Sequence, residues 1–201
     1  MNVPRHKRAF VASLLAALAF AMAARAQDAP APRETVTTSV GGKKVSIEYG
    51  RPALKGRTLD QLMAQLPADR IWRAGGDQVT TIKTETALLL GGKKVPAGKY
   101  TVYMHVPAEG NASLVLNSDK GIALIKLWDK APSNLANEPW PHLEGYSNIA
   151  ATEVARAEMR PGSAAPPTQM FTVAMAPTSV GATATLSWGD RTWSLDLVPA
   201  K

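Results

Sequence analysis

Residues 49–78 combine cations and aromatic side chains of the kinds that bind anions and sugars. The cations are Arg51, Lys55, Arg57 and Arg73, and the aromatic residues are Tyr49 and Trp72. A guanidinium group can donate two parallel hydrogen bonds to a carboxylate or a phosphate, and an aromatic face can stack on a ring. Asp77 and Gln78 add polar groups near the end of the segment. The segment therefore predicts a binding site for an anionic small molecule or a glycan.

The same side chains also fit a structural role, and the sequence leaves both interpretations open. In the structural interpretation Arg51 and Arg57 pair with nearby acids or donate to loop carbonyls, while Trp72 fills the core. Ion-pair networks and binding sites share this residue composition, so composition does not separate them. Arg73 is the arginine expected nearest to any ligand, because two glycines and two polar residues soon follow it.

Catalysis is the alternative to binding. An envelope hydrolase or a glycan-processing enzyme would use Asp77 as its acid, together with Arg73 and Tyr49. The neighbouring Gln78 disfavours this role, because an amide does not exchange a proton as a carboxylate does. The sequence contains neither the HExxH pattern of zinc proteases nor the GxSxG pattern of serine hydrolases, and we expect no metal and no cofactor. Non-catalytic binding of a ligand or partner is the favoured hypothesis.

Alternating polar and apolar residues predict that β-strands carry much of the chain. The alternation runs through residues 34–40 and 45–49, on either side of a Gly-Gly-Lys-Lys tetrapeptide that recurs at Gly91. A phosphate-binding loop would need a helix directly after the glycines. Strand patterns follow both copies instead, so both predict hairpin turns with solvent-exposed lysines.

Further strand patterns occur along the rest of the sequence. They are KYTVYMHV, ASLVLN, IALIKLW, MFTVAMA, TATLSW and TWSLDLV. The last two flank Gly189-Asp190, which predicts a tight hairpin that brings Trp188 and Trp193 together across two strands. Residues 149–160 fit a helix or a strand, and their alternation favours a strand.

One short helix is expected after Thr58. Thr58 and Gln61 form a capping-box pair, apolar residues follow at helical spacing, and Pro67 ends the element. Many short strands with one short helix predict an all-β fold, either an antiparallel β-sandwich or an open barrel. The irregular stretch from Trp128 to Asn148 suits either a platform for a sugar ring or a cover over one end of the fold.

Residues 1–26 have the composition of a secretory signal peptide. A basic start at Arg5–Arg8 precedes an apolar stretch, and Ala24-Arg25-Ala26 supplies the small residues that signal peptidase recognises. The apolar stretch is short for a membrane span, and none is expected after cleavage. We expect residues 27–33 to be a flexible lead-in and residues 34–201 to form a single domain. The mature protein is then periplasmic or secreted.

The high positive charge of the chain comes partly from this leader. The leader holds four cations and no acid, so cleavage lowers the formal net charge from +7 to +3. A nucleic-acid-binding domain keeps a strongly basic face, so no nucleic-acid partner is expected. The chain has no cysteine, so the exported fold must depend on its hydrophobic core instead of on disulfides.

Three short motifs are the most specific in the sequence: Tyr49-Gly50-Arg51-Pro52, Lys55-Gly56-Arg57 and Trp72-Arg73. Together with the segments around them, from about Val45 to Val198, they resemble the bacterial exported domain of unknown function family 2911. That family usually continues after Trp-Arg with Gly-Ala-Asn-Glu-Ala-Thr, and Gln78 stands here where the family has its glutamate. Gln78 would impair a catalytic role and would preserve a hydrogen-bonding one. The resemblance implies an all-β fold and export, and it supplies no known activity.

Export predicts a defined N-terminus. When the full chain is expressed in a Gram-negative host, we expect cleavage after Ala26 and a soluble mature protein that begins at Gln27. N-terminal sequencing of the protein from the periplasmic and membrane fractions measures this. A protein that still begins at Met1, recovered with the membranes, would contradict the prediction.

Overall fold

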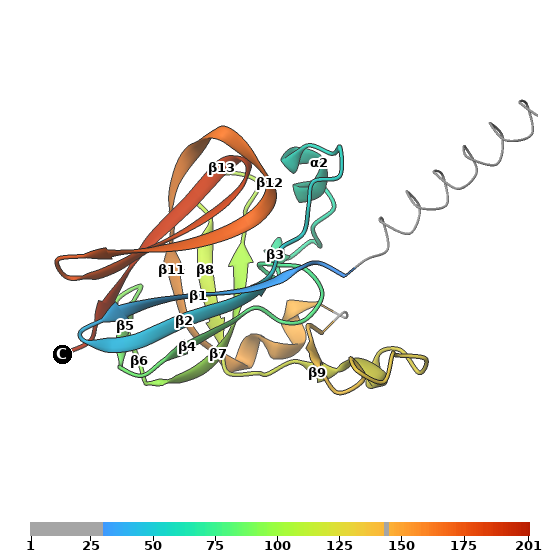
Figure 1. Ribbon diagram of the computed structural model, residues 1–201, viewed down its shortest axis with the longest axis horizontal. Helices are drawn as coiled ribbons and strands as arrows, with labels where there is room; N and C mark the ends of the chain where they lie inside the picture. The colour runs from blue at the N-terminus through green and yellow to red at the C-terminus, as the bar shows by residue number, and fades with distance from the viewer. Residues whose placement is uncertain (1–29, 143–144) are drawn as a thin grey trace, which may run out of the picture. The chain divides into compact units, whose positions relative to one another are not determined.

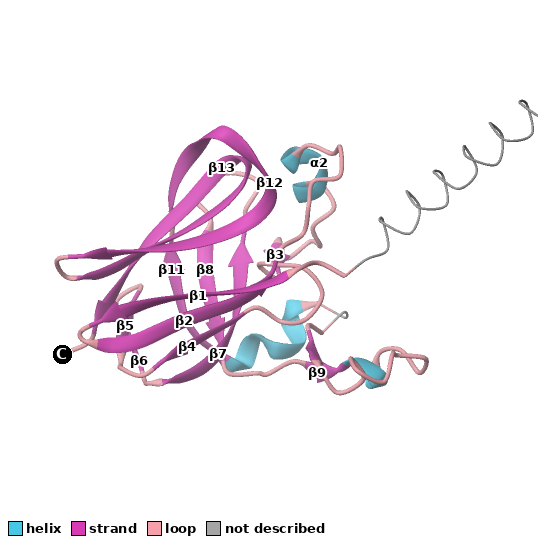
Figure 2. Cartoon of the chain, viewed as in Figure 1, coloured by secondary structure: helices cyan, strands magenta, loops and turns pink. Residues whose placement is uncertain are grey.

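Two antiparallel β-sheets packed face to face form the domain (Figure 1). The computed structural model describes residues 30–142 and 145–201; the predicted signal peptide and residues 27–29 of the predicted lead-in lie outside them. Within the described residues, helix is confined to short segments, which are the cyan ribbons of Figure 2. The prediction of an all-β antiparallel fold is confirmed, and its two layers are those of a sandwich.

The larger sheet has seven strands in the order β1-β2-β4-β7-β8-β11, and β3 pairs with β7 beyond the end of β4. The strands are β1 (Arg33–Val40), β2 (Lys43–Gly50), β3 (Ile71–Trp72), β4 (Thr81–Thr84), β7 (Gly98–His105), β8 (Ser113–Asn117) and β11 (Glu153–Glu158). Neighbouring strands in this sheet run antiparallel throughout.

The smaller sheet has four strands in the order β12-β13-β5-β6. They are β5 (Leu88–Leu90), β6 (Lys93–Val95), β12 (Arg160–Thr178) and β13 (Gly181–Pro199). Outside the two sheets lie a two-stranded ladder of β9 (Ile122–Ala123) with β10 (Pro139–Trp140), the helix α2 (Leu59–Met63), and the 3-10 helices η1 (Leu124–Lys126) and η2 (Tyr146–Thr152).

Both copies of the Gly-Gly-Lys-Lys tetrapeptide form hairpin turns, as predicted. Gly41-Gly42 joins β1 to β2, and Gly91-Gly92 joins β5 to β6, with positive φ at both residues of each turn. This is the backbone geometry that glycine adopts without strain and that matches the twist of paired strands. The lysines that follow are exposed in both turns.

The predicted hairpin at Gly189-Asp190 is wrong, because β13 runs without interruption through these residues. Gly189 has a φ of 60°, and the register with β12 shifts beside it. Trp188 and Trp193 are five residues apart, so a regular strand would place them on opposite faces. The irregularity at Gly189 interrupts the regular alternation of side chains between the two faces of the strand. Both tryptophans are therefore buried in the same core.

Two other stretches differ from simple strands. In IALIKLW only Ile122–Ala123 is strand, and a 3-10 helix follows in which Leu124 is buried and Ile125 is exposed. Residues 149–160 were expected to form either a helix or a strand, and they form part of each. The 3-10 helix η2 ends at Thr152, and strand β11 begins at Glu153. The predicted helix is confirmed: Thr58 and Gln61 exchange both capping-box hydrogen bonds.

An aromatic cluster forms the centre of the core between the sheets. Trp72 stacks on Trp188 with ring centroids 5.2 Å apart. Phe171 meets Trp72 edge-on at 4.9 Å and Tyr49 edge-on at 5.6 Å. Such contacts add to the hydrophobic stabilisation from the area that the rings bury.

A second, smaller cluster lies on the other face of the larger sheet. It contains Tyr103, Val115, Tyr146 and Ile149, with Ile71 packed against it. The buried residues of both clusters lie between Val40 and Leu197, so this part of the chain contains its own core. None of the described helices combines the length and apolar character needed to cross a bilayer.

Close backbone packing predicts which glycine the fold tolerates least. A Cβ at Gly50 would lie 2.1 Å from the carbonyl oxygen of Gly76, a contact that only backbone movement relieves. We expect Gly50→Ala to lower the free energy of unfolding by about 3 kcal/mol or more. Gly98→Ala, whose nearest neighbour is the end of the Tyr100 side chain at 3.2 Å, should cost less than about 1 kcal/mol. Urea unfolding measures both, and equal losses would contradict this account.

Candidate functional site

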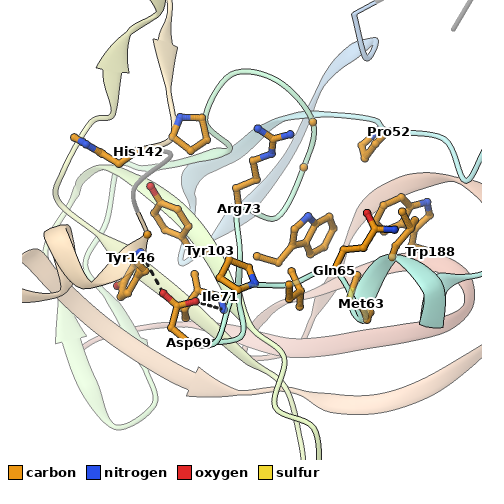
Figure 3. Close-up of a pocket in the computed structure, with 18 of the residues that line it drawn as sticks. Pro52, Met63, Gln65, Asp69, Ile71, Arg73, Tyr103, His142, Tyr146 and Trp188 are labelled. Carbon is orange, nitrogen blue, oxygen red and sulfur yellow. Dashed lines mark hydrogen bonds between the residues drawn. The ribbon is translucent and has the colours of Figure 1, made fainter. Parts of the chain in front are cut away.

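A cavity of about 460 Å³ opens beside the end of β3 (Figure 3). Its walls come from the end of α2 and the loop after it, from residues 69–76, from Tyr103 of β7, from Pro141 and His142, from η2, and from Trp188 of β13. The cavity thus lies at the edge of the larger sheet, where the aromatic core and the outer cluster approach each other. Its volume is in the range of small-molecule sites.

The loop that carries Arg73 leaves the sheet between two strands that share one neighbour. Both β3 and β4 pair with β7, β3 through Met104 and His105 and β4 through residues 98–101. The chain between them bulges outward from Arg73 and returns at Thr80, whose carbonyl accepts from the Val102 amide at 2.8 Å. This bulge forms one wall of the cavity.

Backbone contacts hold the bulge against β2. The Gly76 amide donates to the Gly50 carbonyl at 3.3 Å, and the absence of a side chain at Gly50 permits this approach, because a Cβ there would lie 2.1 Å from the Gly76 carbonyl oxygen. At the other side of the bulge, the Thr80 hydroxyl donates to the Ala74 carbonyl at 2.8 Å. Asp77 has a φ of 59°, and its carboxylate accepts from the Ala31 amide at 2.6 Å. The bulge is therefore fixed along its length.

Arg73 lines the cavity and is partly buried. Among the described arginines, it alone has no hydrogen bond or ion pair to another described residue. The others donate to carbonyls, hydroxyls or carboxylates: Arg33, Arg51, Arg57, Arg70, Arg156, Arg160 and Arg191. Figure 3 shows the Arg73 side chain extending along the cavity wall.

Aromatic rings form much of the remaining wall. Trp72 and Trp188 lie at one side and are almost fully buried, at 9% and 4% exposure. Tyr103 and Tyr146 lie at the other side, with ring centroids 5.2 Å apart in an edge-on contact. The hydroxyl of Tyr103 is buried and has no hydrogen-bond partner in the structure. Burial, reinforced by the negative charge of Asp119, raises the pKa of Tyr103 to about 12, so this hydroxyl remains a donor at neutral pH.

His142 lies on the same side of the cavity as Tyr103 (Figure 3). Its Nε2 is 3.1 Å from Oδ1 of Asp119. An ionised carboxylate can only accept, so Nε2 carries the proton of this hydrogen bond. Nδ1 has no hydrogen bond to a described residue, which leaves one ring nitrogen for a ligand.

A hydrogen-bond network fixes η2, which closes this side of the cavity. The Tyr146 amide donates to Asp69 at 3.2 Å, and the Ile71 amide donates to the other Asp69 oxygen at 3.1 Å. The Tyr146 hydroxyl donates to Glu153 at 2.9 Å and accepts from the side-chain Nδ2 of Asn117 at 3.2 Å. Both oxygens of Asp69, the carboxylate in the cavity lining, are thus engaged with backbone amides.

The sequence matches the family described as "Protein of unknown function (DUF2911)" over residues 31–197. The chain belongs to this family. The resemblance of the three motifs to family 2911 is confirmed by this match. Comparisons with curated proteins and with solved structures give no match.

The predicted site residues of this family 2911 member do not all reach the cavity. Those that line it are Arg57, Trp72 and Arg73. Arg57 is exposed and donates to the Leu54 carbonyl at 3.1 Å. Lys55 is exposed on the preceding turn and lies outside the lining.

The remaining predicted residues have structural roles. Tyr49 is fully buried, and its hydroxyl bonds to Glu34 and to the Val173 backbone. Arg51 forms an ion pair with Glu34 at 3.0 Å and donates to the Phe171 carbonyl. Asp77 holds the Ala31 amide, and the side-chain oxygen of Gln78 accepts from Arg33 at 3.4 Å. The structure therefore does not place Asp77 and Tyr49 beside Arg73 in the cavity.

Five polar residues of the described cavity lining were not among the predicted site residues: Gln65, Asp69, Tyr103, His142 and Tyr146. His142 belongs to the irregular stretch that was expected to form a platform or a cover, and the stretch does contribute to a wall. No spacing rule connects these residues, because they come from three segments that only the fold brings together. Within the described part of the chain, no group of three or more His, Cys, Asp or Glu side chains could hold a metal ion.

Glu153 predicts how pH affects the network behind the cavity. Its hydrogen bond from Arg156 lowers the pKa of its carboxyl below the ordinary 4.5, against the opposing effect of burial. A carboxyl with a lowered folded-state pKa stabilises the fold above its unfolded pKa, and this stabilisation is lost as the pH falls through the folded pKa. We therefore expect Glu153→Gln to cost about 1 kcal/mol at neutral pH and almost nothing in acid.

Urea unfolding between neutral pH and pH about 3 measures this difference. Glu158→Gln, on the same strand and exposed, serves as the matched control and should show little effect at any pH. If Glu153→Gln differs from the parent by the same amount at every pH, the ionic role of Glu153 is contradicted.

Proposed function

We propose that this chain is a non-catalytic ligand-binding domain of the cell envelope, which holds an anionic small molecule or an acidic glycan unit in the cavity beside β3. The observation that carries the proposal is the partly buried guanidinium of Arg73 in the cavity wall, which has no hydrogen bond or ion pair to another described residue. A cation that is withdrawn from water without a counter-charge costs free energy. A bound carboxylate or phosphate would recover this cost through charge-assisted hydrogen bonds.

The other walls suit a ligand with a ring beside its anionic group. The aromatic surfaces of Trp72 and Tyr146 line the same cavity as Arg73, and such faces stack on sugar or aromatic rings. The Tyr103 ring also lines the cavity, and its hydroxyl is fully buried.

The geometry supports binding over the catalytic alternative. That alternative requires Asp77 and Tyr49 beside Arg73, and both side chains are engaged in hydrogen bonds away from the cavity. Asp69, the acid in the described lining, accepts from two backbone amides. Export and an envelope location follow from the composition of residues 1–26 and belong to the same proposal.

Arg73→Gln tests the proposal directly. We expect D-glucuronate or benzoate to bind the parent, and the variant to bind at least about tenfold more weakly, because one charge-assisted contact is lost. The stability of the variant should equal or slightly exceed that of the parent, since Arg73 has no partner to lose among the described residues. Titration calorimetry measures binding.

Arg160→Gln is the matched control, because Arg160 is an exposed arginine whose ion pair with Asp196 lies outside the cavity lining. It should leave binding unchanged. Inorganic phosphate, glucose 1-phosphate and uncharged glucose complete the panel. The proposal is contradicted if none of the anions binds the parent at millimolar concentration, or if Arg73→Gln binds them as the parent does.

A further inference from the structure

Exposed lysines gather at the end of the domain away from the cavity. They are Lys43, Lys44, Lys83, Lys93, Lys94 and Lys99, and all six are exposed. Figure 1 shows the turn between β1 and β2, together with β5 and β6, at one end, and α2, β3 and β9 at the other. We refer to these six residues and their surroundings as the lysine-rich end.

Strand register brings several of these lysines side by side. Lys83 lies directly opposite Lys99 in the antiparallel pair of β4 and β7. Lys44 and Lys83 border one small recess on the same surface. Like charges directly opposite each other on paired strands are destabilising. Glu48 offsets the repulsion between Lys83 and Lys99 only in part, since its carboxylate is 3.9 Å from the Lys99 ammonium group.

The lysine-rich end accounts for the whole net charge of the domain. Residues 1–30 contain four cations and one acid, so the formal charge of residues 31–201 is +4. The six lysines, with the adjoining Glu48 and Glu85, also sum to +4. The excess of cations at this end would attract it to a diffuse anionic surface.

Apolar side chains are exposed beside the lysines. Leu89 is 45% exposed and lies opposite Lys94 in the hairpin of β5 and β6. Val180 is 61% exposed in the turn between β12 and β13. The next residue, Gly181, packs against the backbone at Leu197, adjacent to Val198, which pairs with Leu89. Two exposed apolar side chains thus lie close to this cationic surface.

We propose that the lysine-rich end docks on an anionic lipid surface, with the lysines over the phosphates and with Leu89 and Val180 at the level of the acyl chains. Lysine suits this role, because it is a flexible point charge that needs no fixed partner geometry. Nucleic acid would leave Leu89 and Val180 in water, whereas a bilayer provides an apolar phase for them. The docking is peripheral and reversible, and it does not depend on the ligand cavity.

Vesicle co-sedimentation tests the proposal with residues 27–201, which contain both hydrophobic clusters and every described strand. The parent should bind vesicles of mixed phosphatidylcholine and phosphatidylglycerol, should bind pure phosphatidylcholine far more weakly, and should be released as salt rises. Each lysine near an anionic surface strengthens binding about fivefold. The triple variant Lys43→Ser, Lys44→Ser, Lys94→Ser should therefore lose on the order of a hundredfold in partition coefficient.

The control is the triple variant Lys120→Ser, Lys126→Ser, Lys130→Ser, which removes the same charge from exposed positions on the segment around η1. It should change vesicle binding by less than about threefold. Leu89→Ser should weaken vesicle binding and leave the binding of heparin, a soluble polyanion, unchanged. Thermal melts confirm that each variant is folded. The proposal is overturned if the parent ignores anionic vesicles, if both triple variants lose equally, or if heparin binds while vesicles do not.

Discussion

The contact between the backbones of Gly50 and Gly76 is the constraint on which the site depends. It allows the bulge after β3 to lie directly against β2, because Gly50 carries no Cβ that would meet the Gly76 carbonyl oxygen. With the bulge fixed there, Arg73 extends into the cavity and Asp77 turns back to hold the Ala31 amide. A looser bulge would let Arg73 swing into water, where its charge would cost nothing and would select no ligand.

The cavity also depends on the place where two hydrophobic clusters meet, at one edge of the larger sheet. Trp72 belongs to the core between the sheets, and its neighbour Ile71 packs against the outer cluster, because successive residues of a strand face opposite ways. The strand β3 has only these two residues, so the sheet ends there and the clusters are not sealed from each other. The cavity occupies this gap, which explains why aromatic rings from both faces of the sheet line one space.

Local sequence signals predicted the local structure well. The glycine pairs at Gly41 and Gly91 demanded positive φ, and the capping pair at Thr58 fixed the start of α2, because each depends on neighbouring residues alone. Gly189 misled for the same reason: a glycine at positive φ serves a bulge as readily as a turn, and only the length of the paired strand β12 distinguishes them.

The site was predicted less completely, because the roles of its residues depend on partners far away in the sequence. Arg73 was expected to lie nearest to any ligand, from the glycines that follow it, and its side chain lines the cavity. Asp77 was not recognisable as the partner of Ala31, a residue 46 positions away. Tyr103 and His142 carried no local signal, since each becomes a cavity residue only when β7 and the segment before η2 are packed together.

The central claim is that Arg73 is the anion contact of the cavity. The most direct test follows the arginine side-chain Nε–H signals by nuclear magnetic resonance while D-glucuronate is added to ¹⁵N-labelled protein, with assignment by single Arg→Lys variants. The account predicts a saturable shift of the Arg73 signal, with the signals of Arg51 and Arg160 unmoved. Saturable shifts confined to other arginines, or no shift of Arg73 at saturating ligand, would contradict it.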